Sequence, residues 1–143
     1  MFPAMRIAVG TLGILFGFGT IAWSAFPIFV TLLSWGVAPL GGSNSWLPWA
    51  LALDTMLIIE GILGIVAGRL ILRRSSAAVI TYFSAAGIAL LSIIPGHIFW
   101  QGVNAAHTSF FLVVVLAPAI IFCAIYSAFG MFAWKNPASG VLI

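Results

Sequence analysis

The sequence contains very little charge. Of its 143 residues only two are acidic and five are basic, while 64% are hydrophobic. Seven charged side chains are too few to cover the surface of a soluble domain of this size. A bilayer instead requires an apolar exterior, which this composition can provide. The composition therefore excludes an ordinary soluble domain and indicates an integral membrane protein.

Cysteine and histidine are also scarce, with one cysteine, Cys123, and two histidines, His97 and His107. A single cysteine excludes an internal disulfide and paired-cysteine redox chemistry, so we expect Cys123 to be a small buried apolar residue. A dihaem four-helix cytochrome needs four histidines and is excluded, and the sequence predicts no metal site. It encodes no recognisable cofactor motif. A pigment or haem shared with another subunit through His97 stays open, and we expect His107 to lie in a loop.

Four apolar stretches are each long enough to cross a hydrocarbon core of about 30 Å as a helix. They cover roughly 7–34, 47–72, 77–100 and 109–134. Apolar residues run continuously through them instead of alternating, which argues against a β-barrel. Short connections favour antiparallel neighbours. The sequence therefore predicts an all-α protein, a four-helix antiparallel bundle that forms a single transmembrane domain over 1–143.

The basic residues predict the orientation of this domain. All five lie at one side of the predicted membrane: Arg6, Arg69, Arg73, Arg74 and Lys135. Because basic residues favour the cytoplasmic side, both termini are predicted to be cytoplasmic, in a bacterial-type inner or cytoplasmic membrane. The other side is marked by four of the six tryptophans, at 35, 46, 49 and 100. The positive charge thus indicates contact with anionic lipids and not with nucleic acid.

The first apolar stretch follows Arg6 and holds the small residues Ala22 and Ser24, as a signal peptide does. We expect it to be retained as a helix. Its opening, MRIAVGTLGILFGFG, is similar to the start of DoxX-type four-helix proteins through Arg6, Gly10 and Gly17. This similarity covers under one seventh of the chain, and the sequence assigns no family.

Small residues recur four positions apart, a spacing that allows close contact between membrane helices. The pairs are Gly13 and Gly17, Gly64 and Gly68, and Ala124 and Ala128. We predict that they are helix-packing residues, either within this chain or against a partner.

Glu60 lies near the middle of the second stretch, 14 residues after Trp46 and 14 before Arg74. At ~100° per residue it shares a helix stripe with Met56 and Gly64, so its carboxyl is predicted to face protein. Asp54 lies about 9 Å away along the axis and about 120° around it, so the acids do not form a catalytic dyad.

Three interpretations of Glu60 follow. A dry carboxyl is neutral, because loss of water disfavours its charge, and it can then donate a hydrogen bond to a neighbour. Alternatively Glu60 exchanges a proton or cation, as intramembrane carboxylates often do. It can also pair with a group of another subunit or a lipid, since the predicted helices carry no basic residue at its depth.

Asp54 and His97 form a second candidate site near the outer interface. They are predicted to lie at similar depths and to pair if the second and third helices adjoin. Pro95 frees a backbone carbonyl near Leu91, and Ser92 adds a hydroxyl. The alternative is an interfacial histidine bonded to backbone or water.

These features leave three hypotheses for the function. The first is a small non-catalytic subunit of a larger respiratory, photosynthetic or oxygenase complex, contacting partner helices, lipids or pigments. The second is a small homo-oligomeric transporter or channel in which Glu60 exchanges protons or cations. The third is a quinone- or lipid-modifying enzyme that uses His97 and Asp54; because no other catalytic group converges there, we assign no catalytic residue.

Overall fold

The computed structural model describes residues 3–37, 47–103 and 115–136, and these residues are almost entirely helical. The helices are α1 (Pro3–Val37), α2 (Leu47–Leu72), α3 (Ala77–Leu91), α4 (Ile93–Val103) and α6 (Ala117–Lys135). Within the described ranges there is no β-strand. His107 lies outside them, so its predicted place in a loop stays a prediction.

In the part of the chain that the structure describes, four helical segments are long and apolar enough to cross a membrane. They are Pro3–Phe26, Pro48–Leu72, Ala77–Phe99 and Ala117–Lys135. The prediction of an all-helical protein with four such segments is therefore confirmed. The third segment consists of α3 and α4 together, which are separated only at Ser92. There the amide of Gly96 still donates to the carbonyl of Ser92 at 3.1 Å, so the two helices run on in nearly one line.

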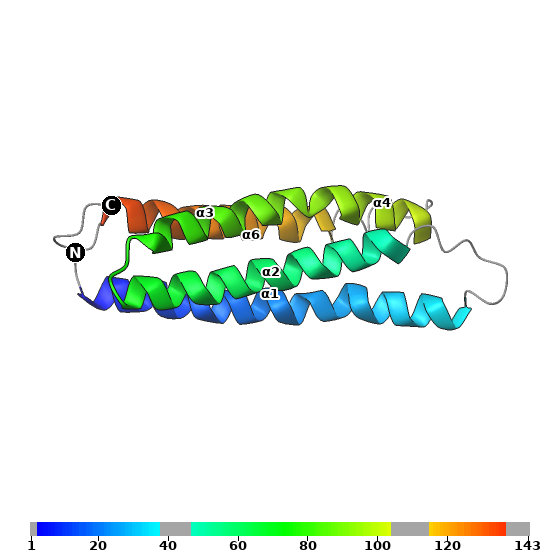
Figure 1. Cartoon of the computed structure of the whole chain (residues 1–143), viewed down its shortest axis with the longest axis horizontal. Helices are drawn as coiled ribbons and strands as arrows, with labels where there is room; N and C mark the ends of the chain where they lie inside the picture. The colour runs from blue at the N-terminus through cyan, green and yellow to red at the C-terminus, as the bar shows by residue number, and fades with distance from the viewer. Residues whose placement is uncertain (1–2, 38–46, 104–114, 137–143) are drawn as a thin grey trace.

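The helices lie side by side, and successive segments run in opposite directions (Figure 1). In that view α1 and α2 form one layer, while α3, α4 and α6 form the other. α1 packs along α2, and α3 packs against both α2 and α6, but α1 and α6 share only a small contact. The start of α1 and the end of α6 lie at the same end of the molecule (Figure 1).

Glycines bring α1 and α2 into backbone contact. A Cβ atom on Gly17 would lie 2.5 Å from the carbonyl oxygen of Gly61, and one on Gly68 would lie 2.6 Å from that of Gly10. Only glycine allows so close an approach. These two contacts fix the antiparallel register of the pair, which places Ser24 of α1 level with Asp54 of α2.

The polarity of α1 is the reverse of that in a water-soluble helix. Its buried positions recur every three or four residues and are Gly10, Gly13, Gly17, Thr20 and Ser24, all small or hydroxyl-bearing. Large apolar side chains point outward, among them Leu15, Phe18 and Phe29, which are 58–60% exposed. This arrangement suits a lipid environment, where the exterior needs no polar groups and small inward residues let helices approach.

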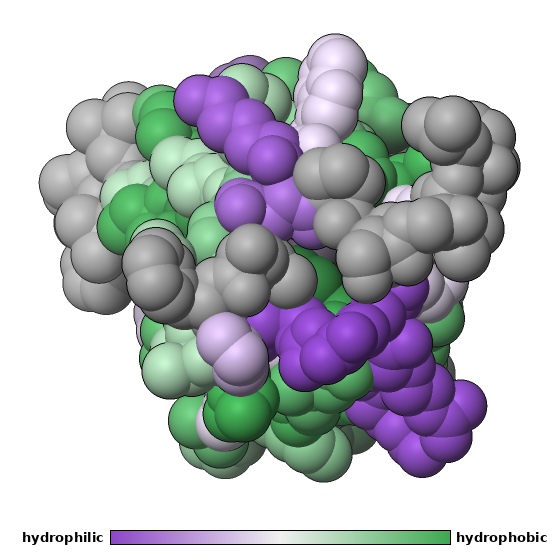
Figure 2. All heavy atoms as spheres, turned by 90° about the vertical axis from the view of Figure 1, so that its left-hand side faces the viewer, coloured by the Kyte–Doolittle hydropathy of each residue, from purple (hydrophilic) through white to green (hydrophobic). Residues whose placement is uncertain are grey.

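Basic side chains mark the end of the molecule where α1 begins and α6 ends. Arg69 lies in the last turn of α2 and Lys135 in the last turn of α6. The α2–α3 turn adds Arg73 and Arg74, the latter in the left-handed region with φ 59°. Figure 2 views this end of the molecule and shows hydrophilic residues gathered on it.

Candidate functional site

Glu60 is completely buried between the helices. It has 0% exposure, and neither of its carboxyl oxygens has a hydrogen-bond partner among the described residues. α2 turns it inward because Glu60 continues the repeat of Leu53 and Leu57, which are also buried. Buried polar atoms are normally paired, so a carboxyl with two unpaired oxygens marks this position as unusual.

Tyr126 of α6 lies beside Glu60 and bonds to α1. Its hydroxyl is 3.0 Å from Thr20 Oγ1, which itself donates to the carbonyl of Phe16 at 3.0 Å. Because a threonine hydroxyl has one proton, Tyr126 is the donor to Thr20, and its own oxygen remains able to accept. The Tyr126 hydroxyl interacts electrostatically with Glu60. It rests against Gly64, one helical turn from Glu60.

Tyr82 brings the third span into the same region. Its side chain has 0% exposure, and its hydroxyl packs against Gly13 without a hydrogen-bond partner among the described residues. Its ring lies 6.4 Å from that of Tyr126, centroid to centroid. Thr20, Glu60, Tyr82 and Tyr126 thus come from four different spans, and we refer to these four residues as the interior polar cluster.

Aromatic rings surround this cluster. Phe16 packs edge-on against Tyr126 and Phe122, with ring centroids 6.0 Å and 5.7 Å apart. The ring centroid of Phe129 lies 5.5 Å from that of Tyr82. Such rings fill space and keep water away from the hydroxyls. Cys123 is half-buried and packs against the same core.

Glu60 was predicted from the sequence as a candidate site residue, but Thr20, Tyr82 and Tyr126 were not. One signal was available for two of them: Tyr82 and Tyr126 are the chain's only two tyrosines, and both lie within predicted membrane helices. Tyrosine in a membrane protein is commonest at the interface, so a tyrosine within a span indicates a buried polar contact.

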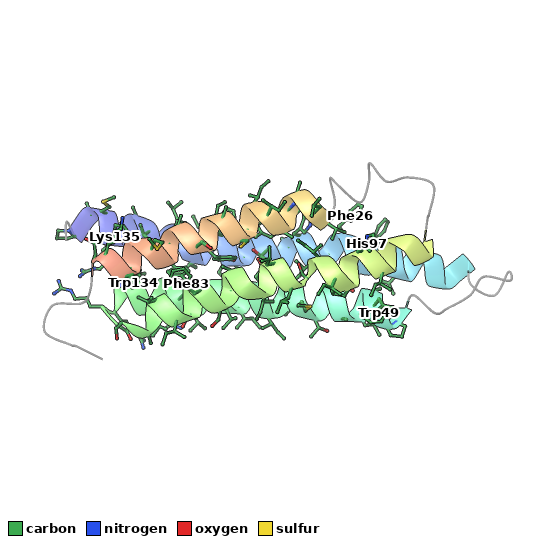
Figure 3. The ribbon with its side chains drawn as sticks, turned by 90° about the horizontal axis from the view of Figure 1, so that it is seen from above. Phe26, Trp49, Phe83, His97, Trp134 and Lys135 are labelled. Atoms are coloured by element: carbon green, nitrogen blue, oxygen red, sulfur yellow. The ribbon has the colours of Figure 1, made fainter. Side chains whose placement is uncertain are left out.

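Asp54 and His97 occupy different environments. Asp54 is 6% exposed, and its Oδ1 atom is buried without a hydrogen-bond partner among the described residues. His97 is exposed on α4, although α2 and α4 are in contact. Figure 3 shows His97 and Trp49 toward one end of the molecule and Lys135 at the other. The ion pair between Asp54 and His97 therefore stays a prediction.

The six small residues predicted to pack helices fall into two groups. Gly13, Gly17, Gly64 and Gly68 lie between helices, where an added Cβ would meet a neighbouring tyrosine or backbone. Ala124 and Ala128 are exposed on α6. They face away from the interior polar cluster, on the outer side of the described helices.

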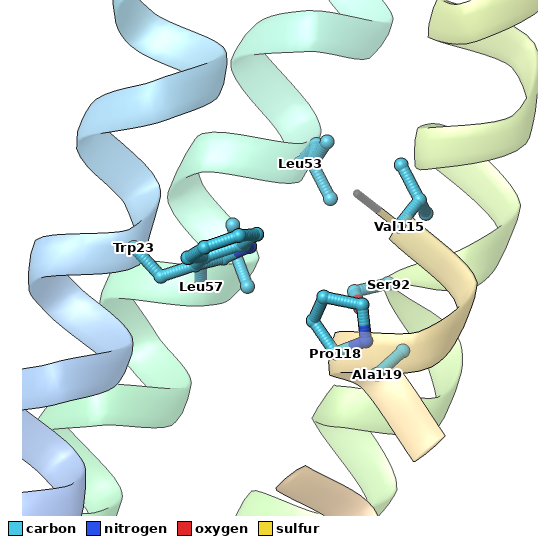
Figure 4. Close-up of a pocket in the computed structure, with 7 residues that line it drawn as sticks. All are labelled: Trp23, Leu53, Leu57, Ser92, Val115, Pro118 and Ala119. Carbon is cyan, nitrogen blue, oxygen red and sulfur yellow. The ribbon is translucent and has the colours of Figure 1, made fainter. Parts of the chain in front are cut away.

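A small cavity lies between the helices, with Trp23 of α1, Leu53 of α2 and Pro118 of α6 among the residues around it (Figure 4). Its volume is about 10 Å³, enough for the centre of one water molecule. The lining residues are Trp23, Leu53, Leu57, Ser92, Val115, Pro118 and Ala119. Ser92 is the only hydroxyl among them, and it donates to the carbonyl of Ala89 at 2.7 Å.

No group of three His, Cys, Asp or Glu side chains that could hold a metal ion occurs within the described ranges. Comparisons with protein-family models, with curated proteins and with solved structures found no match.

Proposed function

We propose that the protein is a small proton-exchanging membrane protein, of the transporter or channel type, in which Glu60 binds and releases the proton. The observation that carries this proposal is the complete burial of Glu60, with neither carboxyl oxygen hydrogen-bonded to any of the described residues. An ionisable group at bilayer depth costs at least ~2.5 kcal/mol on insertion scales, and such groups usually serve an ion or proton path.

The surroundings of Glu60 suit a proton better than a metal cation. Burial favours the neutral carboxyl, and the described basic residues of α2 and α6 lie at the helix ends, away from its depth. The Tyr126 hydroxyl interacts electrostatically with Glu60 and donates its proton to Thr20, so its oxygen remains able to accept a hydrogen bond from the neutral acid.

The proposed arrangement in the membrane is an antiparallel four-helix bundle in an inner or cytoplasmic membrane, with both termini cytoplasmic. Its support is the clustering of basic residues at one end of the molecule (Figure 2). Basic residues are retained on the cytoplasmic side during insertion. For this function, the proposed partner is another copy of the same chain, in a homo-oligomer.

The test is proton flux through the full chain reconstituted in liposomes that contain a pH-sensitive dye. Glu60→Gln keeps the shape of the neutral acid but cannot release a proton, so we expect it to fold normally and to abolish flux. Thr55→Val is the matched control, since Thr55 lies on the exposed side of α2 and bonds only to the carbonyl of Leu51. Flux that survives Glu60→Gln would refute the proposal.

A second candidate is a non-catalytic subunit of a larger membrane complex. It is favoured by Ala124 and Ala128, whose outward position on α6 leaves a shallow surface that fits a partner helix. Native mass spectrometry after mild detergent extraction separates the two candidates. Defined heterologous partners that are lost in Ala124→Leu favour the subunit, whereas a monomer or homo-oligomer favours proton exchange.

The enzyme hypothesis has less support. It requires His97 and Asp54 to act on one substrate, but Asp54 is buried and His97 is exposed. A haem or pigment held through His97 would likewise need a ligand from another subunit.

A further inference from the structure

We propose that the end of the molecule where α1 begins and α2 turns into α3 holds a binding site for the phosphate group of an anionic phospholipid. Arg6 and Ser76 are the central donors of this site. The proposal goes beyond a general attraction between basic residues and anionic lipids, because it assigns the phosphate to two defined hydrogen-bond donors. It does not depend on the role proposed for Glu60.

Two buried polar atoms at this end have no partner in the part of the chain that the structure describes. They are the Nε atom of Arg6 and the Oγ atom of Ser76. Ser76 is the N-cap residue of α3, where a serine hydroxyl usually bonds to the helix, but it makes no capping bond. Both groups can donate a hydrogen bond. Because buried donors are normally paired, these two indicate an acceptor that binds from outside the chain.

The helical repeat of α1 turns Arg6 toward the other helices. At ~100° per residue, Arg6 lies within about 40° of Gly10 and Gly13 around the helix axis. Gly10 packs against Leu72, the last residue of α2, and Gly13 packs against the hydroxyl of Tyr82 in α3. Arg6 comes one turn before Gly10 and is partly buried. It therefore lies level with the end of α2 and with the turn that leads to Ser76.

Backbone hydrogen bonds fix the α2–α3 turn. The amide of Ser75 donates to the carbonyl of Leu70 at 2.9 Å, and the amide of Arg74 donates to that of Ile71 at 3.1 Å, a pattern that closes the C-terminus of a helix. In the first turn of α3, the amide of Ala78 donates to the carbonyl of Ser75 at 3.3 Å. Because these amides are already bonded, the side chains supply the donors for a phosphate.

The charge at this end favours an anion from the membrane. Figure 2 shows hydrophilic residues gathered here, and the five basic residues of the sequence belong to this end. The two acidic residues, Asp54 and Glu60, lie further along α2 and do not neutralise it. Trp134 is 66% exposed beside Lys135, a position typical of tryptophan at the level of lipid headgroups. Charge and position therefore fit an anionic headgroup.

A phospholipid matches both the donors and the apolar surface next to them. The planar guanidinium of Arg6 presents several N–H groups in a geometry that fits phosphate oxygens, and the Ser76 hydroxyl can donate to another oxygen of the same group. The acyl chains can lie along the outer side of α1, where Met5 and Ile7 are each 54% exposed. Inorganic phosphate lacks this apolar contact, so the proposed ligand is a lipid.

The test measures lipid binding to the full chain. Phosphatidylglycerol is titrated into the protein in detergent micelles, native mass spectrometry gives the fraction with bound lipid, and thermal unfolding gives the stabilisation by the ligand. Arg6→Gln and Lys135→Gln each remove one positive charge at this end, but only Arg6→Gln removes a donor of the proposed site. Ser76→Ala removes a hydroxyl without a change of charge, and Ser84→Ala, on the exposed side of α3, is its matched control.

We expect Arg6→Gln to raise the dissociation constant for phosphatidylglycerol about tenfold or more, because a charge-assisted hydrogen bond is lost. Ser76→Ala should also raise it, whereas Lys135→Gln should have a smaller effect than Arg6→Gln and Ser84→Ala none. Equal effects of Arg6→Gln and Lys135→Gln, with wild-type binding in Ser76→Ala, would overturn the site in favour of general attraction.

Two further comparisons complete the test. Inorganic phosphate that raises the unfolding temperature as much as phosphatidylglycerol does would overturn the assignment to a lipid, and so would equal binding of phosphatidylcholine. If Arg6→Gln fails to fold in the membrane, the comparison of Ser76→Ala with Ser84→Ala decides alone. Proton flux is a separate measurement, so the outcome for Glu60 does not affect this one.

Discussion

The hydroxyl of Tyr126 donates to Thr20 Oγ1 at 3.0 Å and so joins α6 to α1, two helices that otherwise share little contact. Both side chains have 0% exposure. The same Tyr126 hydroxyl interacts electrostatically with Glu60. The packing of α6 and the chemistry proposed for Glu60 therefore depend on the same side chain.

Removal of the hydrogen bond between Tyr126 and Thr20 is expected to lower the free energy of unfolding slightly. Tyr126→Phe leaves the accepting oxygen of Thr20 unpaired, and hydrogen bonds between membrane helices contribute ~0.6 kcal/mol on average. The control is Tyr82→Phe, which deletes a hydroxyl without a partner among the described residues and should leave stability unchanged or raised. Unfolding in mixed detergent micelles measures both variants. Equal losses would show that Tyr82 has a partner of its own in the membrane.

The backbone contact between α1 and α2 makes Gly17 sensitive to the smallest enlargement. Gly17→Ala places a methyl group 2.5 Å from the carbonyl oxygen of Gly61, so the helices must separate, at a cost of ~1–3 kcal/mol typical of overpacking. Gly19→Ala is the control in the same helix, because a Cβ there meets nothing within 4 Å. Thermal unfolding in detergent compares the two. A Gly17→Ala protein as stable as Gly19→Ala would contradict the register described above.

Stability and proton exchange are expected to conflict at Glu60. Glu60→Met fills the same space without an unpaired carboxyl, and removal of an unsatisfied buried polar group should raise the free energy of unfolding by ~1–3 kcal/mol. The same change removes the proton site, so flux should fall to the background of empty liposomes. Glu60→Gln serves for comparison, since it retains two unsatisfied polar groups. A less stable Glu60→Met protein would mean that the carboxyl has a structural partner in the native membrane.

The proposed orientation can be tested with cysteine labelling. In a Cys123→Ser background, Ser75→Cys lies in the turn at the basic end, and Pro48→Cys lies at the opposite end, at the start of α2. A membrane-impermeant maleimide should label Pro48→Cys in intact cells and Ser75→Cys only after permeabilisation, because the basic end is expected to be cytoplasmic. The reverse pattern would place both termini outside.

Local features of the sequence were enough to predict where each span lies along the chain. Every long apolar stretch is seen in the structure as a helix, and the differences concern the ends. α1 extends to Pro3 and Val37, beyond the predicted 7–34. Proline is compatible with the first turn of a helix, and the apolar residues after 34 do not interrupt it. Residues 109–114 of the predicted fourth span lie outside the described ranges.

The rotation of each helix about its axis was harder to predict. Apolar residues cover all sides of these helices, so the sequence contains little information about which side faces inward. The pair of alanines in α6 shows the consequence, since Ala124 and Ala128 have the same spacing as the glycines of α1 but face outward. His97 is a second case: its depth was predicted from neighbouring residues, but its exposure depends on how α4 is turned.

The sequence by itself determined that this is a helical protein with four membrane-length apolar segments and an acid near the middle of the second, because these properties depend on composition and on distance along one chain segment. Only the tertiary structure decided that Glu60 is buried in the same interior as Thr20, Tyr82 and Tyr126. Those relationships depend on the register and rotation of helices far apart in sequence. The glycine contacts between α1 and α2 set the register, and the packing of α3 and α6 upon them sets the rotation.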